Sequence, residues 1–426
     1  MSISKKLLTA MLMLLGAAKL SAEAEPRSVD AIAREYVLLE LAMGEHDPAH
    51  VDAYFGPDSL KKQAKEAGLT PQEILQRADV LDQQLASIVI NDPLGRLKEL
   101  RGRLTALKTR VSLFQGELLS FDEESQRLFG ATAPDYDAAY FEAILLEIGR
   151  LLPGEGELSA RVNAFRDQFN IPDNKLDAVF SAAIEECRRR TQKYVALPTG
   201  ENFRIEYVTD KPWGGYNWYE GNAVSLIQVN TDLPTAIDRA VDLGCHEGYP
   251  GHHVYNALLE RDLLRERGWV EFSLYPLFSP QSLIAEGSAN YGIQLAFPGE
   301  ERVTFEKTVL FPLAGLNADD ADRYYELQSL MAKLSYAGNE AARDFLDGTI
   351  TRAEAQAWLV RYALNSPERA AKRLTFIETY RSYVINYNLG MDLVADYVER
   401  DDADIATRWQ RFARILSQPM SASDLK

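Results

Sequence analysis

Eight residues near the middle of the chain combine the residue types of a catalytic metal site. Residues 246–253 read His-Glu-Gly-Tyr-Pro-Gly-His-His and hold three of the five histidines in the chain. In the H-E-x-x-H helix of zinc metallopeptidases, two histidines bind zinc and the glutamate is the general base for a metal-bound water. His246 and Glu247 match the start of that motif, but Pro250 stands where the second histidine belongs.

The spacing of the histidines does not suit a straight helix. His246 and His252 are six residues apart, which places them about 240° around the helix axis, on different faces. His246 and His253 share a face but lie roughly 10 Å apart along the axis, too far for two ligands of one zinc ion. Pro250 has no N–H to donate to the carbonyl of His246. The segment therefore predicts an irregular backbone.

A bulge across residues 248–251 would absorb two residues and return His252 to the face of His246. Gly248 and Gly251 tolerate the unusual dihedrals that we expect there. We therefore predict His246 and His252 as metal ligands, with His253 as an alternative ligand or a neighbour of the ligands. The competing interpretation is a loop rich in glycine and proline in which the histidines are incidental.

A third ligand is needed, because catalytic zinc takes three protein ligands and keeps one position open. Residues 282–291 have a largely apolar helical pattern that contains Glu286, followed by Gly287, Ser288 and Ala289. A glutamate is seldom buried without a partner, and small neighbours allow a second helix to approach closely. This pattern predicts Glu286 as the third ligand. The alternative is a solvated surface glutamate.

Together these segments resemble the bacterial family called domain of unknown function 885, zincin-like relatives of zinc metallopeptidases whose third ligand is a glutamate. The resembling segments are residues 44–47, 52–57, 246–253, 286–287 and 336–343. The resemblance implies a mainly helical zincin fold with a peptidase-like zinc site. Ser288 stands where the family more often has tryptophan, a difference that concerns the shape of the pocket.

Further candidate residues lie late in the chain. Tyr380, Tyr383 and Tyr387 are spaced to share one helix face. Late-chain tyrosines in related metallopeptidases stabilise the oxyanion of the tetrahedral intermediate, so Tyr383 and Tyr387 are candidate catalytic residues. The alternative is that this aromatic stripe belongs to the core. Guanidinium groups bind carboxylates through two hydrogen bonds. The candidate substrate-binding residues are Arg343, Arg381 and Tyr336.

Helical spacing dominates the elements around these candidate sites. It predicts helices over residues 28–44, 59–68, 71–90, 94–119, 137–152, 158–169 and 173–194, and over most of 253–426. Residues 203–208 and 225–230 alternate as strands do, with a turn-rich aromatic loop, 211–220, between them. We expect a mainly α, zincin-like fold with a small antiparallel sheet beside the zinc helix. An edge strand there would bind an extended peptide, unless the aromatic residues merely fill the cleft wall.

The expected organisation is an export signal over residues 1–24 followed by one metallopeptidase-like domain. Within that domain we expect a helical lobe over 25–195, the small sheet over 196–232 and a helical zinc-site lobe over 233–426. The first 24 residues have a basic start, a short apolar stretch and a small-x-small cleavage site. An uncleaved membrane anchor is the alternative. No later run of about 18 apolar residues exists, so we expect no stable membrane insertion after cleavage.

Charge and cysteine content limit the partners and the compartment. The net charge of −17 repels phosphate backbones, which argues against nucleic acid as a partner. Cys187 and Cys245 are the two cysteines, and an oxidising compartment would permit them to pair. We therefore expect a periplasmic or secreted protein.

The leading functional interpretation is an exported zinc peptidase acting on a peptide or a small amide. Glu247 would take a proton from the zinc-activated water and pass it to the leaving amine. One alternative keeps the metal but hydrolyses a non-peptide amide. Another is a non-catalytic zinc-bearing binding protein, against which Glu247 argues because a structural zinc site needs no base.

Overall fold

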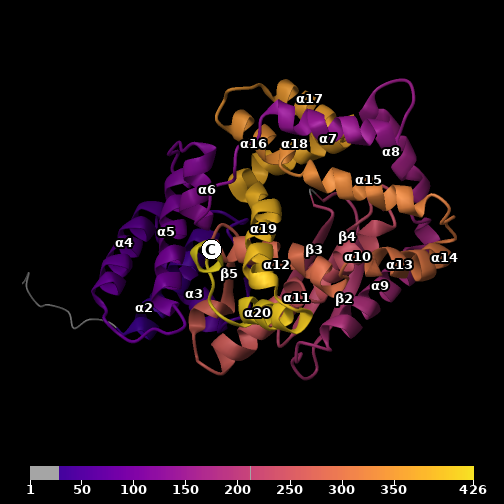
Figure 1. Cartoon of the computed structure of the whole chain (residues 1–426). Coiled ribbons are helices and arrows are strands. Elements are labelled where there is room, and N and C mark those ends of the chain that lie inside the picture. Colours follow the sequence, from indigo (N-terminus) through magenta and orange to yellow (C-terminus); the bar gives the residue numbers. More distant parts are fainter. Residues whose placement is uncertain (1–27, 212) are drawn as a thin grey trace, which may run out of the picture.

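The computed structural model in Figure 1 describes residues 28–211 and 213–426, so the expected export signal at residues 1–24 lies outside the described residues. Helices account for most of the described chain, as the sequence predicts. The helices before the main sheet are α2 (Val29–Gly44), α3 (Asp58–Ala67), α4 (Pro71–Ser87), α5 (Arg96–Phe114), α6 (Phe121–Phe129), α7 (Ala138–Leu151), α8 (Leu158–Arg166) and α9 (Leu176–Thr191).

The helices after the main sheet carry most of the candidate site. They are α10 (Asp238–Leu243), α11 (His252–Leu259), α12 (Pro280–Ala296), α13 (Glu301–Phe305), α14 (Phe311–Ala314), α15 (Ala321–Lys333), α16 (Ala337–Leu346), α17 (Arg352–Tyr362), α18 (Pro367–Tyr380), α19 (Ile385–Glu399), α20 (Ile405–Ser417) and α21 (Ala422–Leu425). Within residues 28–211 and 213–426, no helix is both long enough and apolar enough to span a bilayer.

Local sequence explains where several of these helices begin and end. At α4, the Thr70 side chain accepts a hydrogen bond from the Glu73 amide and Glu73 reaches back to the Thr70 amide, while Pro71 occupies the first helical position. Gly68 ends α3 in the left-handed conformation, with φ of 54°. Such caps satisfy backbone groups that a helix end would otherwise leave without partners.

The main sheet is mixed rather than purely antiparallel as predicted. It has three strands in the order β2–β4–β3, with β2 (Asn202–Val208) parallel to β4 (Val224–Asn230). Only β3 (Gly215–Gly221) pairs with β4 in the antiparallel direction. The aromatic segment predicted as a loop thus forms β3, an edge strand. A second, two-stranded antiparallel sheet pairs β1 (Val51–Tyr54) with β5 (Leu274–Pro276).

The apolar core is divided into two main parts. Side chains of α2 to α5 enclose one part together with Leu274, and Figure 1 shows these helices gathered on one side of the molecule. The larger part includes buried side chains of α6 to α9, the main sheet and nearly all later helices. Helices α6 to α9 therefore share a core with the later helices.

Helices α12 and α19 lie together near the centre of the molecule (Figure 1). Their backbones meet at two glycines: a Cβ atom built on Gly287 would lie 2.3 Å from the carbonyl carbon of Gly390. Only glycine permits such an approach, as the run of small residues after Glu286 suggested. The contact fixes Glu286, on α12, beside the tyrosines that precede and begin α19.

Candidate metal centre

The helix that carries His246 is interrupted, as its sequence predicts. Helix α10 continues into a π-helical turn over Gly244–Gly248, Tyr249 then adopts an extended conformation, and α11 begins at His252. A Cβ atom on Gly251 would lie 1.8 Å from the carbonyl oxygen of His246. Gly251 has φ of −76° with an unusual ψ of −135°, as expected for this segment, and the close backbone approach adds a second reason for glycine at this position.

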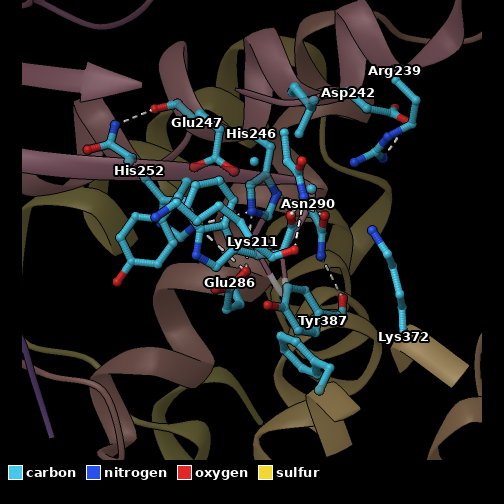
Figure 2. Close-up of a pocket in the computed structure, with 18 of the residues that line it drawn as sticks. Lys211, Arg239, Asp242, His246, Glu247, His252, Glu286, Asn290, Lys372 and Tyr387 are labelled. Atoms are coloured by element: carbon cyan, nitrogen blue, oxygen red, sulfur yellow. Dashed lines mark hydrogen bonds and ion pairs between the residues drawn. The ribbon is translucent and has the colours of Figure 1, made fainter. Parts of the chain in front are cut away.

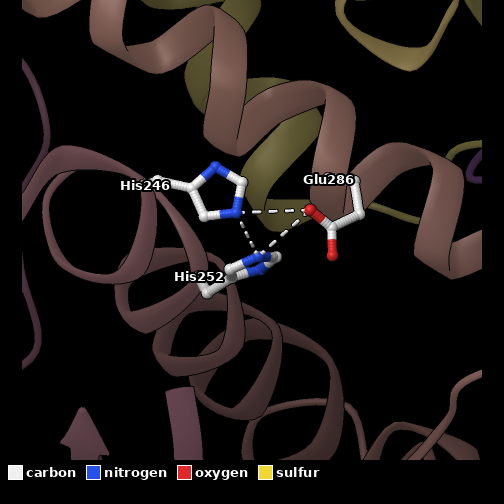
Figure 3. A group of neighbouring side chains, drawn as sticks. All are labelled: His246, His252 and Glu286. Carbon is white, nitrogen blue, oxygen red and sulfur yellow. Dashed lines mark hydrogen bonds and ion pairs between the residues drawn. The ribbon is translucent and has the colours of Figure 1, made fainter. Parts of the chain in front are cut away.

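This interruption turns His252 toward His246, and both face Glu286 of α12 (Figure 3). The two histidine Nε2 atoms lie 3.1 Å apart. Glu286 Oε2 lies 3.2 Å from Nε2 of His246 and 3.6 Å from Nε2 of His252. Two ligand atoms at Zn–N distances of 2.0–2.1 Å with a tetrahedral angle lie about 3.3 Å apart. The three atoms therefore have the spacing of zinc ligands.

The bonding of Glu286 also fits a metal ligand. Its Oε2 atom is buried and makes no hydrogen bond with any described residue, whereas its Oε1 accepts one of 2.7 Å from the Tyr383 hydroxyl. A buried carboxylate oxygen without a donor is costly unless a cation binds it. Although burial opposes ionisation, the charges of His252 and His246 hold the pKa of Glu286 well below its usual value.

Asn290 orients His246 from one helical turn beyond Glu286. Its Oδ1 lies 3.0 Å from His246 Nδ1, and its Nδ2 donates a 2.9 Å hydrogen bond to the Tyr387 carbonyl. A hydrogen bond at Nδ1 leaves Nε2 available to a metal. Sequence reasoning missed Asn290, because no spacing rule distinguishes one helical amide from another.

Glu247 lies beside the triad with its carboxylate directed into a cavity of about 620 Å³ (Figure 2). Glu247 is only 4% exposed. Burial raises the pKa of its carboxyl, although the charges of His246 and His252 oppose the shift. Strand β3 passes close by: Asn217 Nδ2 donates to the Glu247 carbonyl at 2.6 Å. A Cβ atom on Gly215 would lie 3.1 Å from Glu247 Oε1.

The pKa values of His252 and Asp52 are also shifted by their surroundings in the site. Burial alone would lower the pKa of His252. The carboxylates of Glu286, Glu247 and Asp52 outweigh burial and raise this pKa to about 9. Asp52, which lines the cavity from β1, has its pKa raised to about 7 by burial, against the opposing charge of His252. Asp52 belongs to the resembling segment 52–57, but the sequence offered no role for it.

His253, the alternative ligand, is turned away from the triad. It is 1% exposed, with Nδ1 2.8 Å from Ser225 Oγ and Nε2 3.1 Å from Glu201 Oε2. These contacts attach the start of α11 to the main sheet. The remaining two histidines also lie elsewhere: His46 contacts the Leu69 carbonyl and His50 pairs with a glutamate of α2.

The late-chain candidates divide into two groups. Tyr383 and Tyr387 line the cavity, as does Tyr380, although they do not share one regular helix: α18 ends at Tyr380 and a 3-10 turn over Arg381–Val384 precedes α19. Burial raises the pKa values of Tyr383 and Tyr387 well above 10, so both hydroxyls are neutral donors at neutral pH.

The three predicted substrate-binding residues do not line the cavity. The Arg381 guanidinium bonds to Glu124 at 2.6 Å, and Arg343 pairs with Glu340, Asp122 and Asp135. The Tyr336 hydroxyl donates a 2.6 Å hydrogen bond to Asp392. Carboxylates of the protein itself thus occupy both guanidinium groups, which corrects their assignment to a substrate carboxylate.

A disulfide joins Cys187 of α9 to Cys245, the residue before His246, with the two Cα atoms 5.5 Å apart. The pairing that the sequence left open is present. It attaches the π-helical turn to α9.

Comparisons with known proteins show a similar fold in solved structures but do not establish an activity. No family model and no curated protein matches the chain. The structure is similar to a putative lipoprotein from Colwellia psychrerythraea, with a TM-score of 0.52 at 14% identity over 84% of this chain and 68% of that one.

Two further solved structures match more weakly. A putative lipoprotein of unknown function from Shewanella oneidensis has a TM-score of 0.44 at 13% identity, covering 86% of this chain and 75% of that one. The M32 carboxypeptidase from Deinococcus radiodurans R1 has a TM-score of 0.44 at 13% identity, covering 91% and 90%. The resemblance to domain of unknown function 885 therefore rests on the sequence segments alone.

Proposed function

We propose that this chain is an exported zinc-dependent peptidase. The observation that carries the proposal is the convergence of His246, His252 and Glu286 on one point, with Glu247 beside them in a cavity. Three ligands with an adjacent carboxylate form the donor set of a hydrolytic site, whereas a structural zinc site has four protein ligands and needs no base. Zinc bound there would polarise the scissile carbonyl and activate a water.

The residues around that point have the properties that peptide hydrolysis requires. Glu247 accepts the proton of the attacking water and returns it to the leaving amine, a role suited to a buried carboxylate with a raised pKa. Tyr387, a neutral phenol that lines the cavity, donates a hydrogen bond to the oxygen on which negative charge develops. Tyr383 holds Glu286 in place.

The edge strand supports a peptide as substrate. In the order β2–β4–β3, one side of β3 has no neighbouring strand in the part of the chain that the structure describes. Gly215, Tyr216 and Asn217 of β3 line the cavity. An extended peptide bound along this edge would form backbone hydrogen bonds and pass in front of Glu247. The disulfide supports export, because disulfides persist in oxidising compartments.

The test compares a peptide panel with a panel of non-peptide amides, using protein stripped of metal and then reloaded with zinc. We expect the zinc-loaded protein to hydrolyse peptides and the stripped protein to be inactive. Glu247→Gln should retain zinc but lose activity by about 10²–10⁴-fold, the usual contribution of general acid–base catalysis. Hydrolysis confined to non-peptide amides would favour an amidohydrolase. Zinc binding without any hydrolysis would favour a binding protein.

A further inference from the structure

One wall of the cavity is strongly basic, although the chain as a whole has a net charge of −17. We define this cationic wall by five lining residues from α8, α10 and α18: Arg166, Arg239, Arg369, Lys372 and Arg373. Figure 2 shows Arg239 and Lys372 on the side of the cavity away from His252. The wall and the candidate metal centre thus face the same space.

Carboxylates of the protein neutralise only part of this wall. Lys372 pairs with Asp232 at 3.1 Å. Arg239 lies 3.2 Å from Asp242, but Asp242 also forms a shorter ion pair, of 2.8 Å, with Arg302. Asp242 is therefore shared between two guanidinium groups, of which Arg302 also pairs with Glu306 at 2.7 Å.

Three guanidinium groups of the wall have no carboxylate within ion-pair distance among residues 28–211 and 213–426: those of Arg166, Arg369 and Arg373. The Arg369 guanidinium donates only to the Pro234 carbonyl, at 3.4 Å. Nε of Arg166 is buried and has no hydrogen-bond partner in the described chain. The guanidinium of Arg373 lies over the Phe376 ring, 5.0 Å from its centroid.

The protein environment disfavours the charged forms of Arg369 and Arg373. The Arg369 residue is exposed, yet desolvation lowers its pKa, and the charges of Arg166 and Arg239 lower it further against the opposing carboxylates of Asp167 and Asp238. Desolvation also lowers the pKa of Arg373. Partly desolvated cations that repel one another are unfavourable in the empty cavity, and a bound anion would relieve them.

We propose that the cationic wall binds the side-chain carboxylate of an acidic peptide, so that the substrates of this site carry Glu or Asp next to the cleaved bond. The inference rests on the proposed peptidase function, which it makes more specific. A terminal carboxylate alone can be bound by one guanidinium through two hydrogen bonds. Three uncompensated guanidiniums and a fourth that shares its partner exceed that need, which indicates a substrate segment with more than one negative charge.

The wall should discriminate sharply between glutamate and its neutral isostere glutamine. Glutamine has nearly the same shape but leaves the guanidinium groups without a counter-charge, and a site built for a charged group rejects an analogue that lacks it. The same cations would attract acidic peptides over a distance and raise their association rate at low salt.

The test measures binding separately from cleavage. Zinc-loaded Glu247→Gln protein is titrated calorimetrically with two N-acetylated hexapeptides that differ only by Glu or Gln at the central positions, each with a free and an amidated C-terminus. We expect the Glu peptide to bind about tenfold or more tightly, as charge-assisted hydrogen bonds typically contribute. The preference should survive C-terminal amidation and weaken in high salt.

Variants locate the effect. Adding Arg373→Gln or Arg369→Gln to the same protein should bring the Glu-to-Gln affinity ratio close to one, while Arg373→Lys, which keeps the charge, should retain part of it. Arg34→Gln, at an exposed position of α2 outside the cavity lining, is the matched control and should leave the ratio unchanged. Zinc content and Tm establish that each variant is folded.

The outcomes separate this inference from the peptidase proposal. If the wild-type protein cleaves the Glu and Gln peptides equally and binding is also equal, the proposed role of the cationic wall is wrong, whereas the peptidase proposal is retained. A Glu preference in binding without cleavage of either peptide overturns the peptidase and supports the wall. A preference that disappears on amidation overturns side-chain recognition in favour of the terminal carboxylate. Absence of both binding and cleavage overturns both.

Discussion

At the scale of single residues, Asn290 is positioned to orient the His246 ring, a candidate zinc ligand. Its Oδ1 fixes the ring through Nδ1. We predict that Asn290→Ala lowers zinc affinity by about 10–100-fold, the usual effect of removing a group that orients a ligand. Competition with a chromogenic chelator measures it. Gln294→Ala, one turn further along α12 at an exposed position, is the control; equal affinities of the two variants would contradict the role of Asn290.

Tyr383 and Tyr387, two of the tyrosines that line the cavity, should have separable roles. Tyr383 donates to Glu286, so Tyr383→Phe should mainly weaken zinc binding. Tyr387 lines the cavity and its side chain makes no hydrogen bond to a candidate ligand among the described residues, so we propose that its hydroxyl stabilises an oxyanion. Tyr387→Phe should therefore lower kcat by about 10²–10³-fold, as loss of an oxyanion donor does, with zinc affinity unchanged. Measuring kcat and zinc affinity in both variants tests this; a reversal of the two effects would exchange the assignments.

Residue type and spacing were sufficient to propose the three ligands and the base, because few functions require histidines and glutamates in that pattern. Residue type and spacing were insufficient to predict which arginines bind a substrate. Arg381 bonds to Glu124, 257 positions earlier in the chain, and Arg343 pairs with Glu340 of its own helix and with Asp122 of α6. The partner of a guanidinium depends on tertiary packing. For the same reason the cationic wall, drawn from α8, α10 and α18, has no signature in the sequence.

At the scale of elements, the interruption before α11 depends on Gly251. Because a Cβ atom there would lie 1.8 Å from a backbone oxygen, we predict that Gly251→Ala displaces His252 and strongly reduces both zinc affinity and Tm. Gly248→Ala is a control within the same segment, since its Cβ would meet Phe203 at an ordinary 3.5 Å. Zinc titration and thermal unfolding measure the difference. A Gly251→Ala protein as stable and zinc-binding as Gly248→Ala would refute the requirement.

Glu201, whose contact with His253 helps to attach α11 to the sheet, should make the free energy of unfolding depend on pH in the acidic range. Burial opposes ionisation of Glu201, but hydrogen bonds from His253, Tyr249 and Arg188 outweigh it and hold the pKa below 4.5. Glu201 therefore stabilises the fold fully above about pH 4.5, and this contribution is lost as pH falls through the folded-state pKa. We predict that Glu201→Gln flattens the decline in unfolding free energy between about pH 5 and pH 3. Exposed Glu185→Gln on α9 should leave that decline unchanged; identical profiles for both variants would contradict the assignment.

The helices were more predictable from sequence than the strands. Long helices such as α2, α4 and α5 match their expected ranges closely, because apolar spacing and caps act locally. Helix α6 was missed, although a capping box of Ser120 and Glu123 marks its start. Strand β3 was missed because polar Asn217 is buried and aromatic Trp218 is exposed, so hydrophobicity does not alternate with burial along it. Strands β1 and β5 pair residues more than 200 positions apart, so nothing local specifies them.

At the scale of the whole molecule, the candidate site is assembled from distant segments around the α12–α19 pair. The interrupted helix supplies two ligands and the base, α12 supplies the third ligand, and the chain leading into α19 supplies the tyrosines. The edge strand β3 and the cationic wall form further parts of the cavity. The backbone contact between Gly287 and Gly390 holds these parts in register.

The most direct test of the central claim is anomalous diffraction at the zinc absorption edge from crystals of the zinc-loaded protein. We predict one strong peak between Nε2 of His246, Nε2 of His252 and Oε2 of Glu286, about 2.0–2.2 Å from each atom. The peak should disappear in His252→Ala crystals. A zinc peak at His253, or an ordered triad without any peak in crystals that contain zinc elsewhere, would contradict it.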